Sequence, residues 1–163
     1  MAIQSLRTGD CIDEVLNKYS DMVYRLALVN LKSKHNAEDV LQDVFLALIS
    51  KPRTFNDEEH LKAWLIRVTI NRSRSLISSA WFKKIDPLDE NLVFETSEET
   101  DLFEYLFLLP QKYRSVIHLF YGEDLTVRQI GTALNQKEST VRSWLTRARA
   151  ILRAKLKGDF FNE

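Results

Sequence analysis

The segment LTVRQIGTALNQKESTVRSWLTRARAIL, residues 125–152, predicts two helices joined by a tight turn. The first helix is expected at 126–134, where apolar side chains recur at three- and four-residue steps: Val127, Ile130 and Leu134. Gly131 is expected where the two helices approach closely, because glycine inside a helix otherwise costs about 1 kcal/mol relative to alanine. This spacing is typical of a helix-turn-helix.

The turn and the second helix complete the pattern. Asn135 tolerates the left-handed backbone that a tight turn needs, and Ser139 or Thr140 is expected to cap a helix over 139–157. Gln136 departs from the pattern, since an apolar residue is usual after the turn. The inward face of the second helix is expected to hold its apolar residues: Val141, Leu145, Ala148, Ile151, Leu152 and Leu156.

The remaining surface of that second helix is basic. From Lys137 to Lys157 there are seven basic residues and one acid, Glu138. Such a helix suits the DNA major groove, where side chains near its N-terminus reach base edges and later Arg and Lys residues meet phosphates. The alternative is a solvated basic face of a helical bundle, but the combined pattern favours DNA.

The first half of the chain also predicts amphipathic helices. Asp10 is expected to cap the first helix, and Asn36 the second, which ends before Pro52. A third helix begins near Glu58, after a loop at 52–57. The apolar stripe of the second helix is expected to hold Ala37, Val40, Leu41, Val44, Phe45, Leu48 and Ile49.

Charge is segregated along the chain. Residues 61–84 hold six basic residues and no acid, whereas 86–104 hold eight acids and no Lys or Arg. We therefore predict an all-α protein of two small helical domains, 1–81 and 101–163, joined by a flexible acidic linker at 82–100. The second domain contains the helix-turn-helix, preceded by short helices near 102–109 and 113–120.

Composition excludes several other classes of protein. The 163 residues are 45% hydrophobic and carry 23 basic and 23 acidic side chains, so net charge identifies no partner. The single cysteine, Cys11, excludes an internal disulfide and a cysteine-based zinc site. No apolar run approaches the roughly 20 residues of a membrane span. A cytoplasmic protein without cofactor or metal is expected; one helix bearing His35, Asp39 and Asp43 cannot complete a metal site alone.

Two parts of the sequence resemble a known family. AEDVLQDVFLALI (37–49) and FNDEEHLKAWLIRVTINRSRSLI (55–77) are similar to region 2 of extracytoplasmic-function (ECF) sigma factors of bacterial RNA polymerase. LPQKYRSVIHLFYGEDLTVRQIGTALNQKESTVRSWLTRARAILRAKL (109–156) resembles their region 4. The order and the intervening linker also match, and together these segments cover well over half of the chain.

The resemblance implies a sigma factor that binds core RNA polymerase, recognises and melts promoters, and initiates transcription. Its implied partners are the largest-subunit coiled coil and the flap region of polymerase, promoter DNA and an anti-sigma factor, with no membrane insertion. The coiled coil would bind Asp39, Gln42 and Asp43. The −10 element would be bound by Arg53, Arg67, Asn71, Arg72, Arg74, Lys83 and Lys84.

The resemblance also assigns the −35 element to the second helix of the helix-turn-helix. The positions that match the DNA-facing residues of the family are Thr140, Arg142, Ser143, Thr146, Arg147 and Arg149. The chain also departs from the family: many relatives carry an Asp and then a basic residue in the stretch where this chain has Ser75 and Ser78, and Trp144 stands where Arg is frequent.

Two other classes of protein fit parts of the sequence. A stand-alone helix-turn-helix regulator would bind duplex DNA without polymerase, but the first half does not suggest a ligand or dimerisation domain. A helical adaptor would bind only proteins, which the segregated basic patches disfavour. An enzyme is not expected, since His35, His60 and His118 are scattered and no phosphate-binding Gly loop is present.

Overall fold

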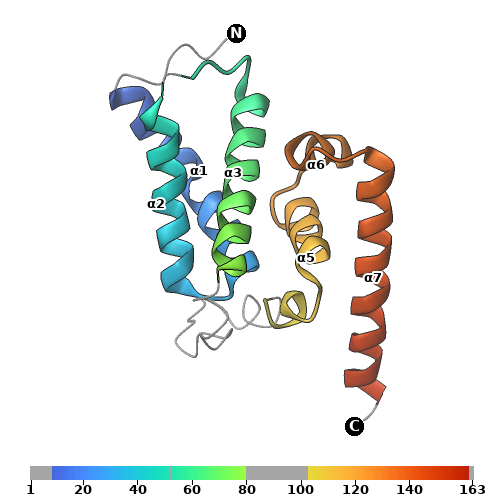
Figure 1. Ribbon diagram of the computed structural model, residues 1–163. Helices are drawn as coiled ribbons and strands as arrows, with labels where there is room; N and C mark the ends of the chain where they lie inside the picture. The colour runs from blue at the N-terminus through green and yellow to red at the C-terminus, as the bar shows by residue number, and fades with distance from the viewer. Residues whose placement is uncertain (1–8, 52, 80–102, 162–163) are drawn as a thin grey trace. The chain divides into compact units, whose positions relative to one another are not determined.

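The computed structural model describes residues 9–51, 53–79 and 103–161, of which side chains are described for 12–51, 53–79 and 103–157. The elements assigned in these ranges are all helices, which confirms the predicted all-α fold (Figure 1). The chain divides into two compact units, Met1–Asn91 and Leu92–Glu163. The predicted linker at 82–100 and both of its boundaries lie outside the described residues, so the domain limits stay predictions.

The first unit is a bundle of three helices, and each of them contacts the other two: α1 (Gly9–Leu31), α2 (Lys34–Ser50) and α3 (Glu58–Ser78). The apolar stripe of each helix faces the centre of this bundle. The largest side chains that are fully buried there are Val23, Leu26, Val29, Val44, Leu48, Leu61, Leu65 and Ile66. Burial of this kind stabilises the unit by about 1.5–3 kcal/mol for each large side chain.

Two of the predicted caps in this unit are wrong. Helix α1 begins at Gly9, so Asp10 lies inside the helix. Helix α2 is capped by Ser33, whose hydroxyl accepts a hydrogen bond from the backbone N–H of Asn36 at 3.3 Å, so Asn36 lies in the first turn. Both Ser and Asn are good caps, and the extended backbone of Ser33 decides between them.

One member of the predicted α2 stripe is also wrong. Ile49 is 49% exposed, and Leu46 on the same side of the helix is 52% exposed. Successive residues of a helix are turned by about 100°, which carries Ile49 beyond the buried line that ends at Leu48. Two large apolar side chains of α2 therefore face solvent.

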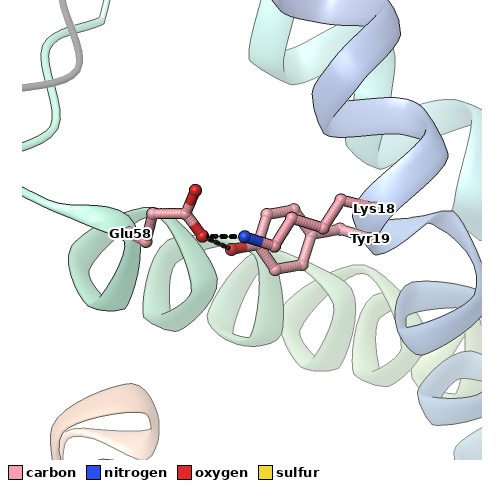
Figure 2. A network of polar contacts seen from close by, with 3 residues as sticks. All are labelled: Lys18, Tyr19 and Glu58. Carbon is pink, nitrogen blue, oxygen red and sulfur yellow. Dashed lines mark hydrogen bonds and ion pairs between the residues drawn. The ribbon is translucent and has the colours of Figure 1, made fainter.

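A polar network joins α1 to the start of α3. The Tyr19 hydroxyl donates to Glu58 Oε2 at 2.7 Å, and the Lys18 ammonium donates to the same oxygen (Figure 2). The hydrogen bonds from Lys18 and Tyr19 lower the pKa of Glu58, while burial and the Glu58 carboxylate raise the pKa of Tyr19. Asp57 caps the same helix end, where its carboxylate accepts from the backbone N–H of His60 at 2.7 Å.

Replacing Tyr19 with Phe is expected to lower the free energy of unfolding of the first unit by about 1 kcal/mol, because one hydrogen bond is lost without a cavity. A lowered Glu58 pKa stabilises the fold above the ordinary value of 4.5, and this contribution is lost as pH falls through the folded-state pKa. The difference between wild type and Tyr19→Phe should therefore shrink in acid. Urea unfolding at pH 7 and below the Glu58 pKa measures it; equal stabilities at pH 7 would contradict the expectation.

The second unit contains a helical segment at 103–107 and four labelled elements: α5 (Gln111–Ile117), η2 (His118–Gly122), α6 (Val127–Leu134) and α7 (Glu138–Phe161). Helix α7 packs against both α5 and α6. The element η2 is a π-helical turn that continues α5, and the Glu123 N–H donates to the His118 carbonyl oxygen, five residues back, at 3.1 Å. No helix in the described ranges is long and apolar enough to cross a membrane.

Arg114 of α5 is a buried cation that holds the preceding segment in place. Its side chain is 6% exposed, and it donates from Nε to the Leu106 carbonyl oxygen at 3.2 Å and from Nη2 to that of Leu109 at 3.0 Å. The guanidinium also lies over the Phe107 ring. Burial lowers the pKa of Arg114 to about 10, so the group stays charged near neutral pH. These bonds satisfy carbonyl groups where the segment at 103–107 ends.

Candidate nucleic-acid interface

The helix-turn-helix forms as predicted at its first helix and its turn. Thr126 caps α6, and the side chains and backbones of Thr126 and Gln129 bond reciprocally at 3.1 and 2.9 Å. Asn135 ends the helix in the left-handed conformation, with φ 55° and ψ 48°. The predicted caps of the next helix are wrong, because α7 begins at Glu138 and the Val141 N–H donates to the Lys137 carbonyl oxygen at 3.1 Å. Ser139 and Thr140 therefore lie in its first turn.

Gly131 is needed for a close approach of backbones, but the nearest backbone belongs to the turn rather than, as predicted, to the second helix. A Cβ on this residue would lie 2.8 Å from the Gln136 carbonyl oxygen. The Gln136 N–H also donates to the Gly131 carbonyl oxygen at 2.9 Å. This contact sets the direction in which α7 leaves the turn.

Replacing Gly131 with Ala is expected to lower the free energy of unfolding of the second unit by about 1 kcal/mol. The gain of about 1 kcal/mol in helix propensity is outweighed by steric overpacking, which costs about 1–3 kcal/mol, because the obstructing atom belongs to the backbone. Thr132→Ala on the exposed side of the same helix is the control, with an expected change under about 0.5 kcal/mol. A Gly131→Ala protein more stable than wild type in urea unfolding would contradict this expectation. It would show that the turn backbone at Gln136 can shift to admit the Cβ at little energetic cost.

The inner face of α7 is apolar and its outer face is polar. Val141, Leu145 and Ala148 are buried, while Ile151, Leu152 and Leu156 are half-buried. On the other side, four of the predicted DNA-facing residues are exposed: Arg142, Ser143, Thr146 and Arg147. The helix therefore presents a polar, basic surface of the kind that a DNA groove accepts.

Two further predicted DNA-facing residues are half-buried, Thr140 and Arg149. Arg149 donates from Nε to the Tyr121 hydroxyl at 2.8 Å, and its guanidinium lies 5.6 Å from the Phe120 ring centroid. The sequence did not signal this contact, because the π-helical turn is what brings Tyr121 to α7. Arg149 is thus anchored against η2 rather than extended from the helix.

In the first unit, the outer face of α2 carries the predicted polymerase-binding residues. Asp39, Gln42 and Asp43 are all exposed. Leu46 and Ile49 continue the same face toward the end of the helix, since residues three and four apart lie side by side. The surface is therefore acidic at one end and apolar at the other.

Helix α3 presents most of the predicted −10 residues. Arg67, Asn71 and Arg74 follow at four- and three-residue steps, so they share one exposed face. Arg72 is exposed on a different face. Lys83 and Lys84 lie outside the described residues. The α3 face therefore combines two cations with one amide that is able to bond a base edge.

The loop at 53–57, which precedes α3, packs onto that helix. The Arg53 guanidinium lies 4.5 Å from the Trp64 ring centroid, and Nη2 donates to the Ala47 carbonyl oxygen at 3.4 Å. Phe55 is buried, and its ring forms a T-shaped contact with that of Trp64 at 6.0 Å between centroids. Trp64 is half-buried between these two contacts and therefore serves to pack the loop against α3.

Comparisons with known proteins match both halves of the chain. Residues 15–83 match the family Sigma-70 region 2, and residues 102–152 match the family Sigma-70, region 4. The ECF RNA polymerase sigma factor SigM of Bacillus subtilis (strain 168) is 30% identical over 155 residues, which cover 88% of this chain and 93% of that protein. The chain belongs to the ECF sigma-factor family. SigW of the same organism is 27% identical over 177 residues and covers 95% of each chain.

Two solved structures have a similar fold. CnrH, in complex with the cytosolic domain of CnrY, has a TM-score of 0.69 at 21% identity and covers 93% of this chain and 91% of its own. The sigma factor RpoE of Bartonella quintana, in complex with the anti-sigma factor NepR, has a TM-score of 0.69 at 20% identity, covering 90% and 97%. At these identities the likeness concerns the fold.

One departure of this sigma factor within region 4 has a structural correlate. Trp144, where the family often has Arg, is half-buried, and the Lys112 ammonium of α5 lies 5.5 Å from its ring centroid. The indole therefore packs on α5 and binds a cation there. Gln136 is exposed, so its polar side chain disturbs no buried packing.

His35 and Asp39 of region 2 lie close together, but the described residues do not complete a metal site around them. His35 Nε2 lies 3.5 Å from the Asp39 carboxylate. Within the described ranges, however, no three His, Cys, Asp or Glu side chains gather as a metal ion would require.

The exposed apolar pair of α2, Leu46 and Ile49, was not predicted from the sequence. Leu46 already fell outside the predicted apolar stripe, so its exposure could have been predicted.

Proposed function

We propose that the protein binds core RNA polymerase and directs it to promoters, contacting the −35 element through α7 and the −10 element through α3. The observation that carries the proposal is the match to sigma regions 2 and 4, in that order, on one chain. Sigma factors in general are not enzymes, and we propose that this one acts by binding alone. We propose that it acts in the cytoplasm, where RNA polymerase is found.

The −35 contacts are assigned to the exposed residues of α7. Arg142 and Arg147 supply charge, and Ser143 and Thr146 offer hydroxyl groups that suit bases or phosphates. Thr140 lies in the first turn, where a major-groove helix approaches base edges. Arg149 contributes by its charge while it remains bonded to Tyr121.

The −10 contacts are assigned to the shared face of Arg67, Asn71 and Arg74. Melting a promoter requires cations for the phosphates and a polar group for an unstacked base. Arg53 is assigned to the edge of this face, where its stack on Trp64 holds it in a fixed position. Lys83 and Lys84 are assigned to phosphates by sequence alone.

Polymerase contacts are assigned to the outer face of α2. Its acidic and amide groups, Asp39, Gln42 and Asp43, suit a basic partner such as a coiled coil of the largest subunit. The exposed Leu46 and Ile49 supply the apolar centre that binding surfaces usually contain. We assign the contact with the flap region of polymerase to region 4. We also propose an anti-sigma factor as a regulatory partner, because RpoE was solved in complex with the anti-sigma factor NepR and CnrH in complex with the cytosolic domain of CnrY.

Run-off transcription with core polymerase across a promoter library tests the proposed function. Transcripts that require both the protein and a defined upstream sequence are expected. A stand-alone regulator would instead bind duplex DNA tightly without polymerase, and an adaptor would bind neither DNA nor promoter complexes. Absence of association with core polymerase, or association without promoter-dependent transcripts, would refute the proposal.

A further inference from the structure

A hollow of about 460 Å³ lies between α2 and the C-terminal end of α3. The residues that line it are Asp39, Val40, Gln42 and Asp43 of α2, Arg72, Ser75 and Leu76 of α3, and Ser79 just after α3. The lining thus combines charged and polar groups with two apolar side chains. This size and composition suit one or two long side chains of a partner.

Arg72 belongs to this hollow and lies away from the face assigned to the −10 element. Arg67, Asn71 and Arg74 share one side of α3, whereas Arg72 is turned by about 100° from Asn71. Arg72 thereby faces the same space as Asp39 and Asp43. The family resemblance assigned Arg72 to promoter DNA from its charge and its place in the sequence, which do not define its face.

We infer that Arg72 and the α2–α3 hollow bind RNA polymerase rather than promoter DNA. The inference rests on the proposed function, because it extends the polymerase surface assigned to α2. Leu46 and Ile49 continue that surface along the same helix. Acidic residues therefore line the hollow itself, and the apolar pair Leu46 and Ile49 follows them along α2. The cores of protein interfaces are commonly apolar and their rims polar.

The charges of the hollow favour a protein occupant over a nucleic acid. Asp39, Asp43 and Arg72 sum to one negative charge, and two carboxylates would repel a phosphate group placed beside Arg72. Among residues 12–51 and 53–79, no salt bridge within 4.0 Å joins Arg72 to either aspartate. A polymerase segment with a basic group toward α2 and an acidic group toward Arg72 would complement these charges.

The test separates binding to core polymerase from binding to DNA. Fluorescently labelled full-length Arg72→Glu and Arg72→Gln proteins are titrated with core polymerase in the absence of DNA. The affinity of Arg72→Glu is expected to fall tenfold or more, and that of Arg72→Gln by a smaller factor. Each holoenzyme, assembled at saturating core polymerase, is then titrated with a labelled −10 fork DNA, and its affinity is expected to stay within twofold of wild type.

Arg67→Gln is the matched control, since it removes the same charge from the other face of α3. It is expected to bind core polymerase normally and to weaken binding to the fork DNA. Normal core binding by Arg72→Glu, or a comparable loss of DNA binding by its assembled holoenzyme, would overturn the inference while leaving the proposed function intact. Failure of the wild-type protein to bind core polymerase would instead overturn the function. Thermal unfolding of Arg72→Gln, equal to wild type, shows that folding is unchanged.

Discussion

Substituting alanine for both Arg142 and Arg147 is expected to weaken binding of the holoenzyme to the −35 element by about thirtyfold or more. Both side chains are exposed on the outer face of α7, and each DNA contact of this kind contributes about 1–3 kcal/mol. Stability should hardly change, because the ion pair between Arg142 and Glu138, at 3.6 Å, is exposed. Binding titrations with −35 duplex measure the effect, together with run-off yield.

The control removes the same number of charges further along the helix. Arg153 and Lys155 are exposed on α7 but lie farther from its N-terminus, so their double alanine variant should weaken binding mainly through nonspecific electrostatics. The Arg142 and Arg147 variant should also lose discrimination between promoter sequences, whereas the control should retain it. Equal losses by the two variants, with discrimination preserved in both, would show that α7 contributes only charge.

Replacing Arg114 with alanine is expected to lower the free energy of unfolding of the second unit by about 3 kcal/mol. The change removes the side-chain donors to the carbonyl oxygens of Leu106 and Leu109. The Leu106 oxygen keeps the backbone N–H of Leu109 at 3.0 Å, whereas the Leu109 oxygen loses its Arg114 donor, and a buried unsatisfied group costs about 1–3 kcal/mol. The substitution also leaves a cavity beside Phe107. A unit of this size has little stability in reserve, so this loss threatens the fold itself.

Hydrogen exchange resolved by residue is the appropriate measurement, because it reports on the two units separately. Protection should fall throughout α5, α6 and α7 and remain unchanged in α1 to α3. The stability of the second unit in Arg114→Lys should lie between those of wild type and Arg114→Ala, because one ammonium group replaces the planar set of guanidinium donors. Arg153→Ala, an exposed substitution in the same unit, controls for loss of charge alone. A loss below about 0.5 kcal/mol in Arg114→Ala would mean that water replaces the guanidinium.

The helix-turn-helix was predictable because its determinants are local. Gly131 permits a close backbone contact, and Asn135 adopts the left-handed conformation of the turn. Both features depend only on residues a few positions away in the sequence. Helix caps were less predictable. Ser33 and Asn36 are both competent caps three residues apart, and only the path of the chain entering α2 selects between them.

Residues whose roles depend on distant elements were not predictable in the same way. Arg72 and Asp43 are far apart in sequence, and only the packing of α2 against α3 brings them to one hollow. Arg149 follows the general pattern of a basic outer face, yet its bond to Tyr121 depends on a π-helical turn that has no periodic signature. Periodicity identifies the faces of each helix, but the pairing of faces arises from tertiary structure.

The π-helical turn at η2 bears on how this chain tolerates changes in length. A π turn holds one residue more than the α-helical turn it replaces, so deleting a residue between His118 and Gly122 would leave an unbroken α-helix. Because the extra residue is contained within one turn, the segments on both sides would keep their directions, whereas side chains inside the turn, Tyr121 among them, would change theirs. Single-residue gaps in alignments of related chains should therefore be found here, and such relatives should have a different partner for the arginine at position 149.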